Sequence, residues 1–471
     1  MKPMGERVLI LSAGVGSGHN SAAEALRRAC LQRPDVDEVR VLDVLQVSSL
    51  LYRDLLSKGY FVLAEGVPWL VEWGYDVSDP PFRRRGPLDP WTRANALPAE
   101  REIRRFAPTA IICTHFLPAQ LVGGMLLRGA GAARTAVVTT DYDFQGLWLT
   151  SAFHRFFVAR EEGRVQLTTL GLPPDRVTAS GIPILPGPDP APEPAARSMV
   201  LVSAGASGGD YALAVVRQTL HLRGDCDVTV VCGRNDELRR DVERLVAGQR
   251  DRYRVLGYTD EMPALLRRAA LFVGKPGGLS ASECMAAGLP MVLVNPIPGQ
   301  EVRNGDYLLE QGAAVRCNTA TTIGWKIDRI LTEPGRLQRM RDAARATGRP
   351  DAAQDVLTGL LHGPRRPLVV TRAAQKAVLA ASEQRIAAAD LTGAHALVRL
   401  VETETGSTVA VLPRTELEDL RRRSGGEGDR VVLKRSTNRL LARLPWEAQR
   451  LQGTVLGDET TLTVAVEPLE A

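Results

Sequence analysis

The sequence predicts an α/β protein in which two Rossmann-like domains face a cleft, followed by a small α+β module. Three observations indicate this class. Short apolar runs alternate with helical patterns along most of the 471 residues, each half begins with a strand that leads into a glycine-rich loop, and a proline-rich segment separates the halves. A chain of this length has room for about three domains.

Ten runs have the length and composition of buried strands. They are Arg7–Leu11, Glu38–Val44, Ala110–Thr114, Ala136–Thr140 and Phe156–Ala159 in the first half, and Met199–Ser203, Asp227–Cys232, Tyr253–Leu256, Leu271–Val273 and Met291–Val294 in the second. Because helical or mixed stretches separate them, we expect βαβ units and two parallel sheets.

The proline-rich segment GIPILPGPDPAPEPAARS, from Gly181 to Ser198, suits neither a helix nor a central strand. We expect it to be an interdomain linker between domains at residues 1–185 and 186–364, with an extra module at 365–471. In that module an alanine-rich helix around Ala373–Ala389 precedes further strands. These are expected at His395–Val401, Ser407–Leu412, Arg430–Leu433 and Thr461–Val466.

The composition is that of a globular protein, with 44% hydrophobic and 24% charged residues. The net charge of +5 permits attraction to phosphates or lipid headgroups without indicating a nucleic-acid partner. The six cysteines have no CxxC spacing, so neither a zinc site nor a disulfide framework is indicated. No apolar run approaches the roughly 18 residues of a membrane span, and we expect a cytoplasmic protein.

The first glycine loop, SAGVGSGHNSAAEAL, leads into a helix whose free N–H groups suit an anion. His19 stands where the dinucleotide-binding pattern requires a third glycine, although Asp43 keeps a nicotinamide or flavin enzyme as an alternative. A helix start among glycines is no packed core position, so His19 is a candidate for chemistry. The other histidines have no ligand spacing and are expected to be structural or exposed; they are His115, His154, His221, His362 and His395.

Two further glycine loops lie in the second half, at Ser203–Leu213 and Gly274–Gly288, and neither has the ending of a P-loop. The pair Asp141 and Asp143 has the DxD spacing of some metal-dependent sugar-nucleotide enzymes. The same spacing occurs twice elsewhere in the chain. We therefore expect no metal site.

The segment GKPGGLSASECMAAGLPMVLVNPIPGQEVRNGDYLLEQGAA resembles the donor half of the monogalactosyldiacylglycerol synthase and processive diacylglycerol glucosyltransferase group, in glycosyltransferase family 28. Other motifs follow in the family's order, namely VVCGRNDEL, VLGYTDEMPALLRRA, TTDYDFQGLW and SGIPI. The resemblance covers about residues 6–360 and leaves out the last hundred.

This resemblance implies a GT-B fold and an inverting transfer of a hexose from UDP-glucose or UDP-galactose to a lipid hydroxyl, most simply that of diacylglycerol. Glu283 would accept the ribose hydroxyls, and the amides of Gly278, Leu279 and Ser280 would stabilise the departing diphosphate without a metal or other cofactor. The full set of implied donor-binding residues is Ser207, Arg234, Tyr258, Thr259, Met262, Gly277, Gly278, Leu279, Ser280, Glu283, Gln300, Glu301 and Asn304. Gln300, Glu301 and Asn304 match the family's sugar-contacting segment, and the sequence leaves glucose and galactose open.

The first loop would face the acceptor. The implied acceptor-binding residues are Gly16, Ser17, Gly18 and His19. His19 is the first candidate for general base or for binding the acceptor headgroup. Asp141 is the second candidate, either as the base or as the residue that orients one.

Two departures from the family leave the acceptor open. Gln145 and Thr150 stand where family members have histidines. A polyprenyl-linked or other hydrophobic acceptor is therefore an alternative, and a nonenzymatic sensor of nucleotide sugar or lipid is another.

The stretch from Leu50 to Trp91 is rich in leucine, valine, tryptophan and tyrosine and contains Arg83-Arg84-Arg85. This composition suits an interfacial segment on an anionic membrane, so we expect peripheral association with the inner face of the cell membrane. An amphipathic helix packed on the first domain is the alternative.

Overall fold

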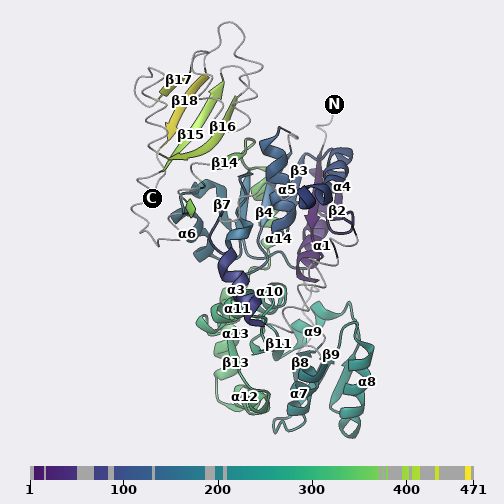
Figure 1. Ribbon diagram of the computed structural model, residues 1–471. Coiled ribbons are helices and arrows are strands. Elements are labelled where there is room, and N and C mark those ends of the chain that lie inside the picture. Colours follow the sequence, from purple (N-terminus) through teal and green to yellow (C-terminus); the bar gives the residue numbers. More distant parts are fainter. Residues whose placement is uncertain are drawn as a thin grey trace.

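The computed structural model describes most of the two domains and the strands of the C-terminal module (Figure 1). The described residues are 5–14, 17–49, 53, 68–82, 90–129, 133–185, 197–204, 209–370, 375, 378–379, 395–402, 406–413, 430–433 and 462–467. The predicted interdomain linker lies mostly outside them.

The first domain is built on a parallel six-stranded sheet in the order β2-β1-β3-β4-β6-β7. Its strands are β1 (Glu6–Ser12), β2 (Val36–Asp43), β3 (Ala110–Cys113), β4 (Arg134–Val138), β6 (Arg155–Val158) and β7 (Val177–Ala179). All four residues of β3 are buried, as expected for a central strand covered on both faces.

The second domain repeats this plan with the order β10-β9-β8-β11-β12-β13, again all parallel. Its strands are β8 (Ser198–Ser203), β9 (Cys226–Val231), β10 (Tyr253–Leu256), β11 (Leu271–Gly274), β12 (Met291–Val294) and β13 (Ala314–Cys317). This is the strand order of a Rossmann fold, so the predicted two-domain α/β class is confirmed.

Helices cover both sheets (Figure 1). Those of the first half are α1 (Ser17–Leu31), α3 (Pro68–Ser78), α4 (Pro90–Phe106), α5 (Phe116–Leu127) and α6 (Glu161–Thr169), with short turns η1 (Gly146–Trp148) and η2 (Pro174–Arg176). Those that follow are α7 (Gly209–Thr219), α8 (Asp236–Leu245), α9 (Met262–Arg268), α10 (Gly278–Ala286), α11 (Gln300–Glu310), α12 (Ile323–Thr332), α13 (Arg336–Thr347) and α14 (Ala352–Leu361), with turns η3 (Ala247–Gln249) and η4 (Ala320–Thr322).

Helix α14 returns to the first domain. Its buried residues Val356, Leu357 and Leu360 share a core cluster with Val8 of β1 and Val138 of β4. The predicted boundary at residue 364 had placed this helix in the second domain, which its packing contradicts. The apolar face of α14 fits the first sheet because that sheet needs a helix on each face.

The chain therefore crosses between the domains twice, and the two crossings touch. Gly181, at the start of the first crossing, has φ +87°, and a Cβ on it would overlap the side chain of Arg349, which lies in the second crossing. Only glycine combines this backbone conformation with so close a neighbour.

The C-terminal module is less separate than the sequence suggested. Its strands β14 (Leu368–Val370), β15 (His395–Glu402), β16 (Gly406–Pro413), β17 (Arg430–Leu433) and β18 (Leu462–Glu467) form a third sheet in the order β17-β18-β15-β16-β14-β5. The last strand, β5 (Ala152–Phe153), belongs to the first domain and pairs antiparallel with β14. The alanine-rich helix lies mostly outside the described residues.

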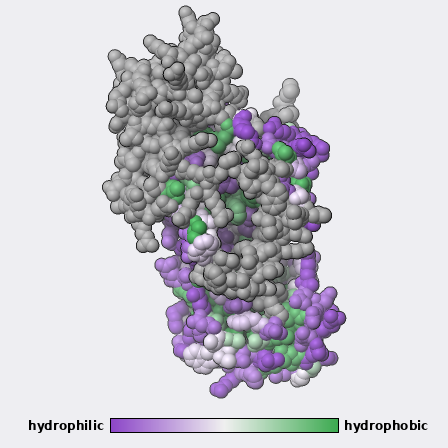
Figure 2. Space-filling model, viewed as in Figure 1, coloured by the Kyte–Doolittle hydropathy of each residue, from purple (hydrophilic) through white to green (hydrophobic). Residues whose placement is uncertain are grey.

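The predicted strands of both domains are present within a few residues, and the four of the module are present as well. The short strands β5, β7, β13 and β14 were missed because two to four residues give too little periodicity. In the part of the chain that is described, no helix is long and apolar enough to cross a membrane. On the face shown in Figure 2 the described surface of the second domain is mainly hydrophilic.

Candidate active site

The two domains meet at the carboxyl ends of their central strands. In each sheet the strand order reverses beside the first strand of the domain, where β1 adjoins β3 and β8 adjoins β11. Ligands bind at such switch points in open α/β sheets. A Cβ on Gly18 of α1 would lie 3.3 Å from Leu279 of α10, so the two helix starts that follow these strands face each other.

His19 lies in the first turn of α1 and is held through one ring nitrogen. Its Nδ1 is 3.0 Å from the carbonyl oxygen of Thr114 and 2.8 Å from the hydroxyl of Thr140. Because a carbonyl can only accept, Nδ1 carries the proton and Nε2 keeps its lone pair. Burial lowers the pKa of His19 to about 4, so the ring is neutral near neutral pH.

His115 is a neighbour of His19 that the sequence reasoning did not connect with the site. It lies two residues after the end of β3, caps α5 by accepting from the amide of Leu117 at 3.1 Å, and is 4% exposed. Its ring meets His19 edge-on with centroids 4.5 Å apart, and Trp148 lies 6.3 Å from His19. Burial lowers the pKa of His115 as well. Its place immediately after a strand next to β1 was the available signal.

Asp141 follows β4 and is bound from the other domain. Asn304 of α11 donates to Asp141 Oδ1 at 3.0 Å and accepts from the amide of Tyr142 at 2.8 Å. Burial raises the pKa of Asp141 to about 6, against the opposing effect of the Asn304 hydrogen bond. Its second oxygen has no partner among the described residues.

These contacts correct two predictions. Asp141 does not orient His19, whose Nδ1 partners are Thr114 and Thr140. Asn304, expected to contact sugar, is fully buried and joins the domains through Asp141 and Tyr142. Carboxylate and amide are complementary hydrogen-bonding partners, so this contact links the two domains.

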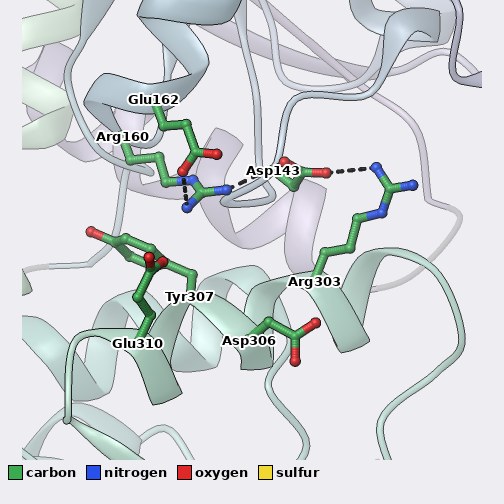
Figure 3. Close-up of a pocket in the computed structure, with 7 residues that line it drawn as sticks. All are labelled: Asp143, Arg160, Glu162, Arg303, Asp306, Tyr307 and Glu310. Atoms are coloured by element: carbon green, nitrogen blue, oxygen red, sulfur yellow. Dashed lines mark hydrogen bonds and ion pairs between the residues drawn. The ribbon is translucent and has the colours of Figure 1, made fainter.

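Asp143 is engaged by arginines of both domains (Figure 3). Its carboxylate accepts from Arg160 at 3.3 Å and from Arg303 of α11 at 2.8 Å. With Glu162, Asp306, Tyr307 and Glu310 these residues line a cavity of about 400 Å³ between the domains. Among the described residues no cluster of histidine, cysteine, aspartate and glutamate could hold a metal ion.

Glu283 stands on α10, one wall of the cleft. Its side chain has no hydrogen-bond or ionic partner among the described residues, and burial raises its pKa to about 7. The first amides of a helix lack intrahelical acceptors, and those of Leu279 and Ser280 have none among the described residues. A Cβ on Gly278 would overlap the Thr140 carbonyl oxygen, so α10 begins directly against the first domain.

The segment after β12 turns sharply before α11. Gly299 caps this helix with φ +87°, a conformation that favours glycine. Glu301 accepts from the amide of Ile297 at 2.6 Å, and burial raises its pKa. A Cβ on Gly277 would lie 3.6 Å from the second oxygen of Glu301, which brings the PGG and PGQE motifs together, with Gln300 in the first turn of α11.

An exposed pair of side chains follows β9 and β10, at the same carboxyl edge of the second sheet as the start of α10. The guanidinium of Arg234 lies over the ring of Tyr258, 4.9 Å from its centroid, and Tyr258 is 63% exposed. Thr259 accepts from the amide of Glu261 at 3.1 Å, and Met262 begins α9. The predicted site residues Ser207 and Gly16, and the side chain of Ser17, lie outside the described part of the chain.

Three residues had supported an alternative cofactor or an alternative acceptor, and each is hydrogen-bonded or buried within the protein. Asp43 accepts from the amides of Gly14 at 3.2 Å and Leu45 at 3.0 Å, so it holds the first loop. Gln145 is 6% exposed and caps η1 through the amide of Leu147 at 2.8 Å. Thr150 is 2% exposed.

Much of the predicted membrane segment, including Arg83-Arg84-Arg85, lies outside the described residues. Within α3, Trp73 is 60% exposed. Tyr75 differs from the expectation for a membrane-facing aromatic residue, because its ring packs against Gly299 of the second domain. In Figure 1, α3 lies beside α10 and α11.

Comparison with known proteins agrees with this geometry. The family model of monogalactosyldiacylglycerol (MGDG) synthase matches residues 19–184, and that of glycosyl transferases group 1 matches residues 210–347. The chain is 27% identical over 372 residues to the processive diacylglycerol beta-glucosyltransferase of Bacillus subtilis (strain 168), covering 76% of this chain and 95% of the relative. For the protein of that name from Bacillus licheniformis the identity is 25% over 377 residues, with the same coverage.

Two solved structures share the fold. Acinetobacter baumannii MurG has a TM-score of 0.51 at 16% identity, covering 76% of this chain and 99% of its own. The S. aureus MnaA–UDP co-structure has a TM-score of 0.50 at 12% identity, covering 76% and 96%. The chain is a glycosyltransferase with the GT-B fold. The resemblance of this glycosyltransferase to the diacylglycerol glycosyltransferase group is confirmed in both domains, and the matched regions include His19, Asp141, Glu283 and Gln300.

Proposed function

We propose that this glycosyltransferase transfers a hexose from a UDP-sugar to the hydroxyl of diacylglycerol, with inversion at the anomeric carbon. The observation that carries the proposal is Glu283, a half-buried carboxylate without a partner among the described residues, beside the open amides of α10. A carboxylate largely withdrawn from water is stabilised by hydrogen-bond donors. The two hydroxyls of a ribose supply them, and the diphosphate then lies toward the start of α10.

The reaction is a single displacement. The acceptor oxygen attacks the anomeric carbon, the bond to the diphosphate oxygen breaks on the opposite face, and the hydroxyl proton passes to a base. Asp141 suits this role, because its pKa of about 6 lies nearer neutrality than that of His19, about 4. His19, neutral and with Nε2 unprotonated, is the alternative base, because the single hydroxyl proton of diacylglycerol can pass to only one of the two residues.

The departing UDP needs no metal in this proposal. The amides of Leu279 and Ser280 and the dipole of α10 stabilise the charge that grows on the diphosphate. Asp143, the second acid of the DxD pair, is occupied by Arg160 and Arg303. Removal of divalent ions with EDTA is expected to leave the rate unchanged; a rate restored only by added metal would refute this step.

The acceptor is inferred from the relatives, which are processive diacylglycerol beta-glucosyltransferases. We place the reaction at the surface of an anionic membrane on its cytoplasmic side, since the net charge of +5 favours such a surface. Gln145 and Thr150 do not argue against diacylglycerol, because both are buried.

The test is a UDP-release assay on phospholipid vesicles with and without diacylglycerol. Each kind of vesicle is tested with UDP-glucose and with UDP-galactose, and the extracted lipids are analysed by mass spectrometry. Release that needs diacylglycerol, with a hexose added to the lipid, supports the proposal and identifies the sugar. Release only with a polyprenyl-linked acceptor would replace diacylglycerol by that class, and UDP binding without turnover on any acceptor would favour a sensor.

A further inference from the structure

The α3 helix places Tyr75 against the predicted sugar-contacting segment of the other domain. A Cβ on Gly299 would lie 2.9 Å from Cγ and 3.0 Å from Cδ2 of Tyr75, so the base of the phenol ring packs against the residue before Gln300. The guanidinium of Arg303 lies over the same ring, 4.8 Å from its centroid. Tyr75 is thereby fixed at the edge of the cleft by residues of α11 and its cap.

Ion pairs hold α3 in this position. Arg303 donates to Asp76 at 3.0 Å and to Asp79 at 3.3 Å, both in or next to α3, while it also binds Asp143 at 2.8 Å. Figure 3 shows Arg303 reaching from α11 to Asp143. One arginine of the second domain thus fixes both α3 and the loop that carries Asp141.

The hydroxyl of Tyr75 has no role in this packing. Its oxygen is inaccessible to solvent and has no hydrogen-bond partner among the described residues. Other buried tyrosines are satisfied: Tyr142 accepts from Ser282 at 3.1 Å, and Tyr253 bonds Thr219 at 2.9 Å. Burying a phenol without a partner costs free energy, and phenylalanine would pack in the same way.

The groups around the Tyr75 hydroxyl indicate which kind of ligand atom it would bind. Asp141, Asp143 and Asp79 are near enough to raise the pKa of Tyr75, although burial is the larger cause, so the phenol stays protonated and can donate. Its ring lies on the segment that leads into Gln300, and Asp141 marks the reacting centre. A neutral donor at this place suits a sugar hydroxyl.

We propose that Tyr75 is a specificity-determining residue whose hydroxyl donates a hydrogen bond to the transferred hexose. The inference rests on the proposed function for the identity of the donor. It makes α3 part of the donor site, although this helix belongs to the opposite domain.

The test compares Tyr75→Phe with wild type in the binding of UDP and of UDP-glucose, or UDP-galactose if that is the better donor. Loss of one hydrogen bond is expected to weaken UDP-hexose binding roughly tenfold while UDP binding stays unchanged. Because the variant removes a buried unpaired group, its Tm is expected to equal or exceed that of wild type. The matched control is Tyr307→Phe, whose ring lies under Arg160 at the same domain contact and lines the separate cavity.

The outcomes separate the two proposals. Equal affinities of Tyr75→Phe and wild type for the UDP-hexose, or equal losses for UDP and UDP-hexose, would overturn the assignment of Tyr75. A changed KM for the lipid with unchanged donor binding would overturn the hexose as its partner. A wild-type protein that binds no UDP would instead refute the proposed function.

Discussion

The helix starts of α1 and α10 face each other across the cleft, yet they differ in whether their polar groups have hydrogen-bond partners within the protein. On the first wall His19 is fixed by Thr114 and Thr140 and packed against His115. On the second wall Glu283 and the amides of Leu279 and Ser280 have no partners among the described residues.

The difference assigns the walls to different tasks. A side chain held by hydrogen bonds is already in place for chemistry, whereas polar groups without partners gain most from a ligand that satisfies them. Under the proposed function the first wall is therefore preorganised, and the nucleotide completes the second. Four experiments test this difference, in order of decreasing expected effect.

The largest effect is expected from Asp141→Asn, which removes the proposed base from the preorganised wall. The turnover number is expected to fall by roughly 10²–10⁴-fold with little change in UDP binding. Since the base must be deprotonated, the wild-type kcat/KM for the lipid, measured at saturating UDP-sugar, is expected to rise with pH through about 6 and then level off. A rise centred near pH 4 that disappears in His19→Gln would transfer the role to His19.

Next comes the contact between the walls, tested by the pair Gly278→Ala and Gly277→Ala. A Cβ at 278 overlaps the Thr140 carbonyl oxygen, whereas a Cβ at 277 meets Glu301 only at 3.6 Å. Gly278→Ala is expected to force the domains apart and lower activity at least about tenfold, since small misplacements of reacting groups are costly. Small-angle scattering should show a larger radius of gyration, and equal activity of the two variants would contradict the close approach.

Glu283→Gln tests the incomplete wall. Ribose hydroxyls bind the ionised carboxylate best, so UDP-glucose binding releases a proton and its affinity rises with pH through about 7. The variant is expected to lose this pH dependence and roughly 10–100-fold in affinity, as for hydrogen bonds to a charged group. Calorimetry at several pH values measures both, with exposed Glu310→Gln as the control; retained pH dependence would mean that another group titrates.

The smallest effect is expected from Asn304→Ala. Its hydrogen bond favours the ionised form of Asp141, so its loss should raise the pKa of Asp141 and move the rise in kcat/KM above pH 6. The rate on the high-pH plateau should change only a few-fold. A plateau loss without any shift in pH would reduce Asn304 to a purely structural contact.

The fold could be predicted almost completely, because parallel strands buried on both faces leave a clear apolar pattern. Glu283, Asp141 and His19 could be named as candidates, Glu283 through the resemblance of its motif and the other two because they lie in loops or helix starts that follow a strand. Contacts between domains could not. The Asn304–Asp141 bond joins residues 163 positions apart, and the edge-on contact of His115 with His19 depends on β3 lying beside β1.

Tyr75 shows the same limit more strongly. Its aromatic neighbourhood suggested a membrane surface, whereas its ring packs on Gly299 of the second domain. The composition of this segment shows that it is apolar and aromatic, but not what it packs against. Tyr75 packs against the second domain because Gly299 has no side chain and leaves room for the ring. Likewise, α14 was assigned to the second domain because it follows that domain in the sequence, whereas its apolar face packs on the sheet of the first domain.

The double crossing of the chain at Gly181 and Arg349 has a mechanical consequence. The hinges of two-domain proteins are a few loop residues that absorb changes in φ and ψ. In this chain Gly181 and Arg349 belong to different connections and are in contact, so a change of backbone conformation at one displaces the other. A larger side chain at position 181 is therefore expected to disturb both connections between the domains at once.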